Sequence, residues 1–312
     1  GWKPQRYFLA VPPGASAMKL TCAAPDGQDS KASLDEVFDP TGKELSDRSA
    51  RVDTEAGRRK VERTFTDELV PGVWEADVLS NRPDRDWPYE LTVRFFGLHA
   101  EPPRIVEWDD GEGELTVTNL FERPLPAVAD GRLEGFGMHK EDTFKGLKDE
   151  LSYTVKLDEQ FGALRVDLEM TPEAYATTTD IGVSVEDESG KALLQDAFSN
   201  RTFTATVDHP SPGETATVKV VIRGGFAVED DKRETPITVK IDRLLAEPME
   251  IKVTRGDSSE VNFVPGVAIK LEYELAGELP KAPEETRPVG YLRFRERNSN
   301  DVALEVPIGI AG

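Results

Sequence analysis

Short segments in which apolar and polar residues alternate constrain this chain more than any other feature. Residues 18–22, Met-Lys-Leu-Thr-Cys, alternate with a period of two, which places their side chains on opposite faces of a strand. Four further segments follow the same style, separated by Pro and Gly turn signals: 7–11, 34–38, 73–78 and 89–95. Closely spaced short strands predict an all-β fold of sandwiches and disfavour a βαβ fold. Only 151–160 and 242–247 are compatible with brief helical turns.

The chain also matches itself. Residues 39–43, Asp-Pro-Thr-Gly-Lys, recur 148 positions later at 187–191 as Asp-Glu-Ser-Gly-Lys. Three more matches follow in the same order, at offsets between 138 and 148: Arg-Thr-Phe-Thr at 63–66 and 201–204, Pro-Gly at 71–72 and 212–213, and Leu-x-Ala-Glu-Pro at 98–102 and 244–248. Four ordered matches predict a duplicated module.

We therefore expect two tandem β-sandwich modules of jelly-roll-like type. Copy one spans 1–149 with its core at about 5–97, and copy two spans 150–312 with its core at about 151–243. Each core is followed by extra strands, at 104–136 and 249–310. The Gly- and Lys-rich stretch 131–148 is the best linker candidate, and the Pro- and Glu-rich stretch 277–288 is expected to be a solvated loop.

Composition narrows the function classes. The formal net charge of −21 repels phosphate backbones and argues against nucleic acid as a partner. No apolar run approaches the roughly 18 residues of a spanning helix, so membrane insertion is not expected. The single cysteine, Cys22, excludes an intrachain disulfide and a cysteine-rich zinc cage, and its place in an alternating strand predicts burial.

Reactive groups in catalytic patterns are missing from the sequence. The three histidines, His99, His139 and His209, have no second histidine at metal-ligand spacing, and there is no His-Glu-x-x-His or Gly-x-Ser-x-Gly motif. Ser16, in Gly-Ala-Ser-Ala, only superficially resembles a nucleophile motif. We expect this chain not to be an enzyme.

Three segments of copy one resemble a known family. They are residues 8–15 (Phe-Leu-Ala-Val-Pro-Pro-Gly-Ala), 71–78 (Pro-Gly-Val-Trp-Glu-Ala-Asp-Val) and 89–93 (Tyr-Glu-Leu-Thr-Val). The pattern resembles the pre-peptidase C-terminal type of β-sandwich of secreted bacterial peptidases. Residues 8–16 also look like the start of the post-catalytic region of tripeptidyl-peptidase II-like subtilases. Copy two is covered only through its likeness to copy one, and has Gln-Phe-Gly at 160–162 in place of the Pro-Gly-Ala entry.

The resemblance implies a non-catalytic accessory region of a larger subtilisin-like serine peptidase. Such a region would position substrate, stabilise the catalytic domain or mediate assembly through protein–protein contacts. The implied partners are the catalytic domain of the parent peptidase and, for assembly, further copies of the chain. An exported location is favoured over the cytoplasm.

An alternative is a carbohydrate- or cell-surface-binding module of an exported bacterial protein. Asp84 and Asp86 stand just before Trp87, a combination that could hold a polysaccharide or a peptide, and Trp108 is a further candidate for an exposed aromatic surface. A loop with a buried or capping tryptophan is the competing interpretation of Trp87.

The acidic run at 109–114 alternates acids with glycines. Calcium takes about six to eight oxygen ligands from flexible loops, so Asp109, Asp110 and Glu112 are candidate Ca²⁺ ligands. The corresponding segment of copy two, 255–260, has lost most of this charge, and a solvated hairpin turn is the competing interpretation. No other cofactor is expected.

Overall fold

The computed structural model of the chain is almost entirely β-structure, which confirms the predicted all-β class. It describes residues 4–45, 50–66, 69–80, 86–106, 108, 111–145, 150–198, 200–226 and 234–309. Within them the one helix is α1, Pro172–Tyr175. The strands are β1 Gln5–Val11, β2 Ala17–Ala23, β3 Ser33–Phe38, β4 Ala50–Arg51, β5 Lys60–Phe65, β6 Gly72–Leu79, β7 Glu90–Phe96, β8 Leu98–Glu101, β9 Glu112–Asn119, β10 Leu125–Lys145, β11 Glu150–Leu157, β12 Phe161–Glu169, β13 Thr178–Asp187, β14 Ala192–Phe198, β15 Thr202–Asp208, β16 Ala216–Phe226, β17 Glu234–Thr254, β18 Glu260–Phe263, β19 Ala268–Leu275, β20 Arg287–Glu296 and β21 Val302–Ile308.

The first seven strands form a sandwich of two antiparallel sheets, ordered β1-β6-β3-β4 and β5-β2-β7. Alternate residues of these strands point into the space between the sheets. Trp74 is fully buried there, and its indole Nε1 donates to the carbonyl oxygen of Val70 at 2.9 Å. Cys22 is buried in the same core, as its alternating strand predicted, and burial raises the pKa of its thiol to about 11.

The second sandwich repeats this strand order. Its sheets are β11-β16-β13-β14 and β15-β12-β17, so each strand occupies the place of its counterpart ten positions earlier in the numbering. The turns after β3 and β13 also match, with Gly42 and Gly190 at φ of 78° and 79°. The division of the chain at 149/150, and a duplication as its origin, stay predictions.

The third unit is a nearly closed, barrel-like sheet to which both halves of the chain contribute. Its strand order is β21-β20-β10-β17-β19-β9-β8, and β18 also pairs with β10. An isolated parallel bridge between Ile105 and Ile308 joins the region after β8 to the end of β21. The extra strands expected after each sandwich are therefore combined in one sheet.

Two expectations are wrong and one is largely confirmed. The supposed linker 131–148 lies, up to Lys145, within β10, a strand of 21 residues that pairs with β17 and β20. The supposed helical turns 151–160 and 242–247 lie largely in β11 and within β17. The predicted loop at 277–288 extends to Thr286, after which β20 begins.

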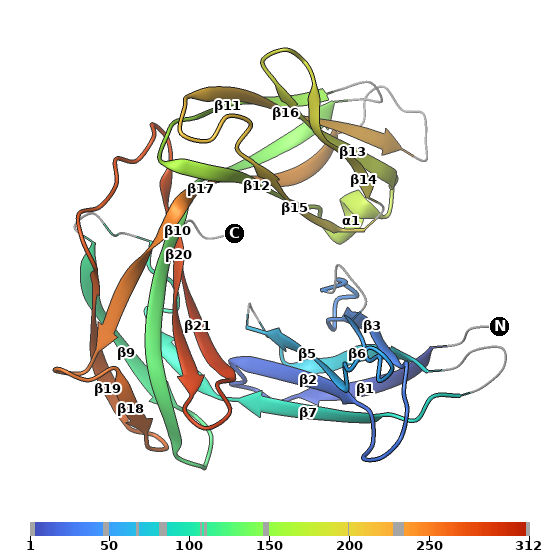
Figure 1. Cartoon of the computed structure of the whole chain (residues 1–312), viewed down its shortest axis with the longest axis vertical. Helices are drawn as coiled ribbons and strands as arrows, with labels where there is room; N and C mark the ends of the chain where they lie inside the picture. Colours follow the sequence, from blue (N-terminus) through green and yellow to red (C-terminus); the bar gives the residue numbers. More distant parts are fainter. Residues whose placement is uncertain are drawn as a thin grey trace.

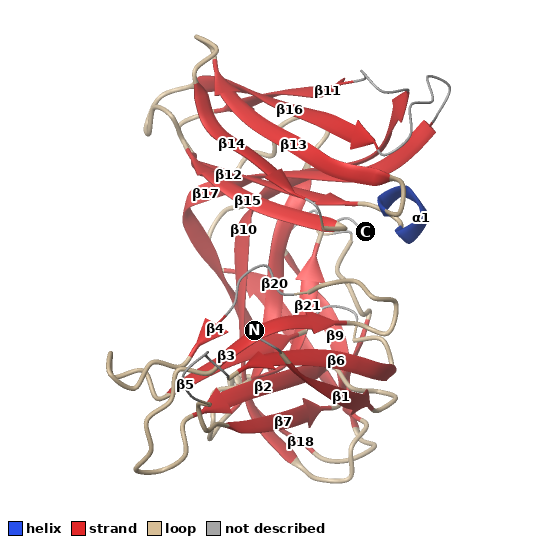
Figure 2. Cartoon of the chain, turned by 90° about the vertical axis from the view of Figure 1, so that its right-hand side faces the viewer, coloured by secondary structure: helices blue, strands red, loops and turns tan. Residues whose placement is uncertain are grey.

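The three units are arranged as an open ring. The barrel-like sheet stands at one side, and the two sandwiches project from its ends toward each other (Figure 1). Figure 2 shows the same units stacked along the long axis. One buried core runs through the barrel and the second sandwich, because β10 and β17 belong to both, whereas the first sandwich has a core of its own. No helix of the described residues is long and apolar enough to cross a membrane.

Candidate functional site

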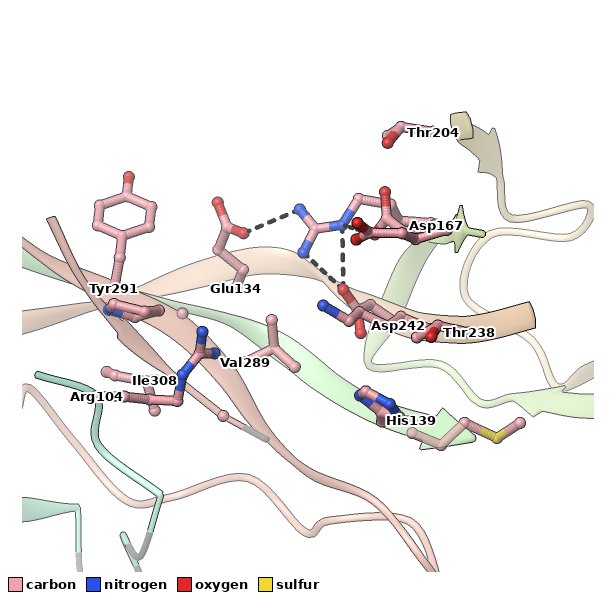
Figure 3. Close-up of a pocket in the computed structure, with 18 of the residues that line it drawn as sticks. Arg104, Glu134, His139, Asp167, Thr204, Thr238, Asp242, Val289, Tyr291 and Ile308 are labelled. Carbon is pink, nitrogen blue, oxygen red and sulfur yellow. Dashed lines mark hydrogen bonds and ion pairs between the residues drawn. The ribbon is translucent and has the colours of Figure 1, made fainter. Parts of the chain in front are cut away.

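The first candidate site is a pocket of about 490 Å³ that faces the inside of the ring. Its floor is the outer face of the sheet formed by β10, β17 and β12, and β20 and β21 supply one wall (Figure 3). Its charged lining residues are the acids Glu134, Asp167, Glu169, Asp242 and Glu305 and the bases Arg104, Arg165, Lys240 and Arg293.

Strand alternation places these charges on one face. In β17 the side chains of Ile237, Val239 and Ile241 are buried in the second sandwich. Thr238, Lys240 and Asp242 therefore point away from that core. The same alternation in β12 directs Arg165, Asp167 and Glu169 into the pocket, while the intervening leucines and valine are buried.

Arg165 is the centre of the pocket's ion-pair network. Its guanidinium contacts Asp242 Oδ2 at 2.6 Å through Nη2, Glu134 Oε2 at 3.3 Å and Asp167 Oδ2 at 3.4 Å. Burial raises the pKa of the Asp242 carboxyl, although the charge of Arg165 opposes the shift. Burial alone would lower the pKa of Arg165, but the surrounding carboxylates raise it overall.

Gly137 makes room for this network. It pairs with Asp242 across β10 and β17, and a Cβ at residue 137 would lie 2.2 Å from Asp242 Oδ1. In the next row of the sheet His139 and Asp167 flank Lys240, since β17 pairs with β10 on one side and β12 on the other. Within the described residues Lys240 forms no ion pair, and it is the cation that a ligand could reach without breaking a pair.

A second wall of the pocket contains an aromatic ring. The guanidinium of Arg293 lies 3.5 Å from the centroid of the Tyr291 ring, and Arg293 also pairs with Glu305. Positive and negative groups nearly balance around the pocket. Such a surface can bind polar or zwitterionic groups by hydrogen bonds and ion pairs.

Sequence reasoning did not select this pocket. The signal that was available is the spacing Arg-x-Asp-x-Glu at 165–169 and Thr-x-Lys-x-Asp at 238–242, which marks a polar strand face. The pairing of β12 with β17 joins segments that are far apart in sequence, and the spacing within each strand does not predict it.

The predicted residues Asp86 and Trp87 lie together in a different and smaller pocket at one end of the first sandwich. It measures about 470 Å³ and is lined by Gln5, Tyr7, Ser80, Asp86, Trp87, Pro88 and Tyr89. Tyr7 and Tyr89 meet through their hydroxyls at 2.5 Å, and the Tyr89 hydroxyl also contacts Gln5 Oε1 at 2.6 Å. Trp87 is only 7% exposed, so its ring offers little open face. Asp84 lies outside the described residues.

The other predicted positions that the structure describes, Trp108 and Glu112, lie in the barrel. Trp108 is 4% exposed and belongs to the core shared by the barrel and the second sandwich. It therefore does not form an exposed aromatic surface together with Trp87. Glu112 begins β9, while Asp109 and Asp110 lie outside the described residues. The described part of the chain holds no group of three or more His, Cys, Asp or Glu side chains that could bind a metal, and the Ca²⁺ site stays a prediction.

The residues considered for catalysis have other contacts. Ser16 Oγ donates to the carbonyl oxygen of Ala303 at 2.6 Å and accepts from the Leu98 amide, which ties the first sandwich to the barrel. His209 is buried and its Nδ1 accepts from the Ser211 amide at 3.0 Å. Between described residues, no serine hydroxyl is hydrogen-bonded to a histidine ring.

Comparison with solved structures finds a match that extends over nearly the whole chain. A crystal structure of tripeptidyl peptidase 2 aligns over 99% of this chain and 28% of that one, with a TM-score of 0.52 and 13% identity. The fold resembles a region of tripeptidyl peptidase 2. The chain thus spans about a quarter of the length of that protein, and at this identity the likeness concerns the fold alone.

Other solved structures match much less well. Xylanase 10C from Cellvibrio japonicus aligns over 38% of this chain and 27% of that one, with a TM-score of 0.24 and 16% identity. A Clostridium perfringens protein with an M60 catalytic domain aligns over 78% and 34%, with a TM-score of 0.22 and 9% identity. These scores are too low to inform function. No protein-family model and no curated protein matches the sequence.

Proposed function

We propose that the chain is a non-catalytic accessory region of a subtilisin-like peptidase and works through protein–protein contacts. The observation that carries the proposal is the match to tripeptidyl peptidase 2, which extends over all three units of the chain while covering only 28% of that protein. The sequence resemblance to the post-catalytic region of related subtilases was independent of this match.

An exposed apolar patch supplies a contact surface for this role. Phe8 in β1 is 66% exposed and Val73 in β6 is 59% exposed, and the register pairs Val73 with Ala10 two residues beyond Phe8. The outward residues of β11, the counterpart of β1, are all polar: Glu150, Ser152, Thr154 and Lys156. Since two sandwiches of one strand order differ here, the apolar residues are not a requirement of the fold. We assign them to contact with the catalytic domain of the parent peptidase.

The reading frame of the source gene tests the proposal first. Upstream of Gly1 it should encode a catalytic core with Asp, His and Ser in subtilase order, and a frame without such a core refutes the proposal. The chain purified alone should not hydrolyse peptide substrates, and activity that a single Ser or Asp substitution abolishes would also refute it.

The patch can be tested with the separately expressed catalytic domain and this chain. The double variant F8T/V73T replaces both apolar residues with threonine, a residue of the polar type found on β11. It should weaken the association of the two proteins by at least tenfold in isothermal titration calorimetry. V267T is the matched control, because Val267 is 48% exposed and lies on the barrel. Equal affinities of F8T/V73T and V267T for the catalytic domain would show that Phe8 and Val73 do not form the contact.

The pocket at Asp86 supports a second candidate function, that of a carbohydrate-binding module. Carboxylate, amide and phenol groups converge there, as hydrogen bonding to a sugar requires. Because Trp87 is buried, its removal would confound binding with folding. D86N is the sharper variant. Loss of polysaccharide binding on D86N, at an unchanged melting midpoint, would favour this function over the peptidase role.

A further inference from the structure

The two sandwiches touch directly across the opening of the ring, although they are far apart in sequence. Lys43 Nζ lies 2.6 Å from Glu169 Oε1, and Arg201 Nη1 lies 3.3 Å from Thr41 Oγ1. Lys43 and Thr41 belong to the turn after β3, whereas Glu169 ends β12 and lines the large pocket. The contact therefore sits at the rim of that pocket.

The corresponding turn of the second sandwich is a built-in comparison. Asp39 Oδ1 accepts from the Thr41 and Lys43 amides at 2.7 and 2.9 Å. Asp187 Oδ1 accepts from the amides of Ser189 and Lys191 at 2.9 and 3.0 Å in the same way. The fold of the turn thus depends on its Asp and Gly, not on the lysine. Lys191 is exposed and forms no ion pair with a described residue, whereas Lys43 reaches another unit.

The other attachment of the first sandwich is narrow and combines ion pairs with a small apolar contact. Lys19 Nζ contacts Asp301 Oδ1 at 2.6 Å, and Arg94 Nη2 contacts Glu296 Oε1 at 2.7 Å, so the sandwich rests on the β20–β21 turn. Among its buried residues, Ala17 and Phe96 belong to the core of the rest of the molecule, and the others form a cluster of their own. The chain crosses from sandwich to barrel at Gly97, where β7 ends and β8 begins.

We propose that the first sandwich is an arm that opens and closes over the large pocket, with Gly97 at its hinge and the turn at residues 39–43 as its latch. The latch pair is partly solvated, with the Lys43 and Glu169 side chains 24% and 40% exposed. A pair of this kind is weak and screened by salt, which suits a reversible contact. Opening separates Lys43 from Glu169 at the rim of the pocket and widens the approach to Lys240 and the Arg165 network.

Spin labels can measure the opening. Asp26 and Glu214 are exposed loop residues on the two sandwiches, and D26C/E214C provides the labelling sites. The native Cys22 is buried with a raised thiol pKa and will not compete for the label. In low salt, K43A should shift the label-to-label distances to a longer and broader distribution, lowering the closed-to-open ratio roughly two- to fivefold.

Three comparisons decide the outcome. K191A, the matched control, should leave the distances unchanged. The charge swap K43E/E169K should restore the closed distribution that K43E alone loses, which separates a latch from a local unfolding effect. At about 1 M salt, where screening acts within roughly 3 Å, the background protein should approach K43A. If K43A, K191A and the background give the same distances in low salt, there is no latch.

Discussion

Replacing Arg165 with methionine tests whether the pocket's charges are held by one guanidinium. Asp242 is 6% exposed and its closest cationic contact is Arg165 Nη2 at 2.6 Å. Methionine keeps most of the stem's volume but removes the charge and the donors. Breaking a buried pair in this way typically costs about 3–5 kcal/mol, because the remaining charge is uncompensated. The Arg165 side chain is 27% exposed, so water replaces part of the lost interaction and we expect about 2–4 kcal/mol.

The pH dependence makes this prediction sharper. Without Arg165, Asp242 can escape its penalty by taking up a proton. Raising its pKa from an ordinary value near 3.9 to 7 costs about 4 kcal/mol, at about 1.36 kcal/mol per pKa unit, and this sets a ceiling on the loss at pH 7. At pH 5 the same ceiling is about 1.5 kcal/mol. A carboxyl whose folded pKa is raised binds more protons folded than unfolded, so the variant recovers stability as pH falls.

The assay must report on the second sandwich. None of the four tryptophans, at positions 2, 74, 87 and 108, falls within the sequence of β11 to β17, so their fluorescence is unsuitable. Native-state hydrogen exchange of peptides from β12 and β17 gives the local free energy of opening directly. R165M should lose about 2–4 kcal/mol at pH 7 and no more than about 1.5 kcal/mol at pH 5.

The double variant R165M/D242N is the control. Removing both charges leaves no buried ion, so it should be more stable than R165M alone at pH 7. A loss in R165M below about 1 kcal/mol that is equal at pH 7 and pH 5 would refute the reasoning. So would a double variant less stable than R165M.

Three further substitutions or conditions test the fold itself. G135A should destabilise the barrel by more than about 2 kcal/mol in thermal or urea unfolding, because a Cβ at Gly135 would lie 2.0 Å from the main-chain oxygen of Arg243, whereas G182A, with nothing nearer than 3.9 Å, should be neutral or slightly stabilising. Cys22 should react with a maleimide at pH 7 only after unfolding, and rapid modification of the native protein would contradict its burial and raised pKa. Burial would raise the pKa of Asp301, but its hydrogen bonds to Lys19 and Ser299 lower the pKa overall. The stabilisation that Asp301 gives to the junction is therefore complete above about pH 4 and is lost as pH falls through the folded pKa. Unchanged hydrogen exchange in β20 and β21 at pH 3 would exclude this role.

Local patterns were sufficient for the strands and turns of the sandwiches. The alternation at 18–22 placed Cys22 in the core, and the Asp-x-x-Gly-Lys turn appears twice with the same hydrogen bonds. These features depend on neighbours within a few residues, which is the range over which period and turn chemistry act.

The glycines of β10 account for the wrong linker prediction. Four glycines and three lysines made 131–148 resemble a linker, but the three glycines within β10 allow close packing instead of flexibility. A Cβ at Gly131 would lie 2.7 Å from Leu292 Cδ2, and a Cβ at Gly137 would touch the Asp242 carboxylate. The partner atoms come from strands more than a hundred residues away. No local rule distinguishes such a glycine from one in a flexible segment.

The burial of the tryptophans could not be decided from the sequence for the same reason. Trp87 and Trp108 lie near the ends of predicted elements, which left both partial exposure and burial open. Trp108 is buried in a core assembled from both halves of the chain. Likewise, the helix-favouring residues near 242–247 form part of β17, because pairing with β10 on one side and β12 on the other outweighs their intrinsic preference.

The two sandwiches share a strand order but join the barrel differently, and one position accounts for the difference. In the second sandwich β17 runs unbroken from Glu234 to Thr254, so sandwich and barrel share a strand and a core. In the first sandwich the equivalent path is interrupted at Gly97, where a Cβ would lie 2.3 Å from the Phe121 ring. An unbroken strand transmits rigidity because its ladder hydrogen bonds continue on both sides. At the break, the first sandwich is held to the barrel by ion pairs to the β20–β21 turn, by the Ser16 hydroxyl and by the buried side chains of Ala17 and Phe96. The proposed hinge lies at this narrower junction.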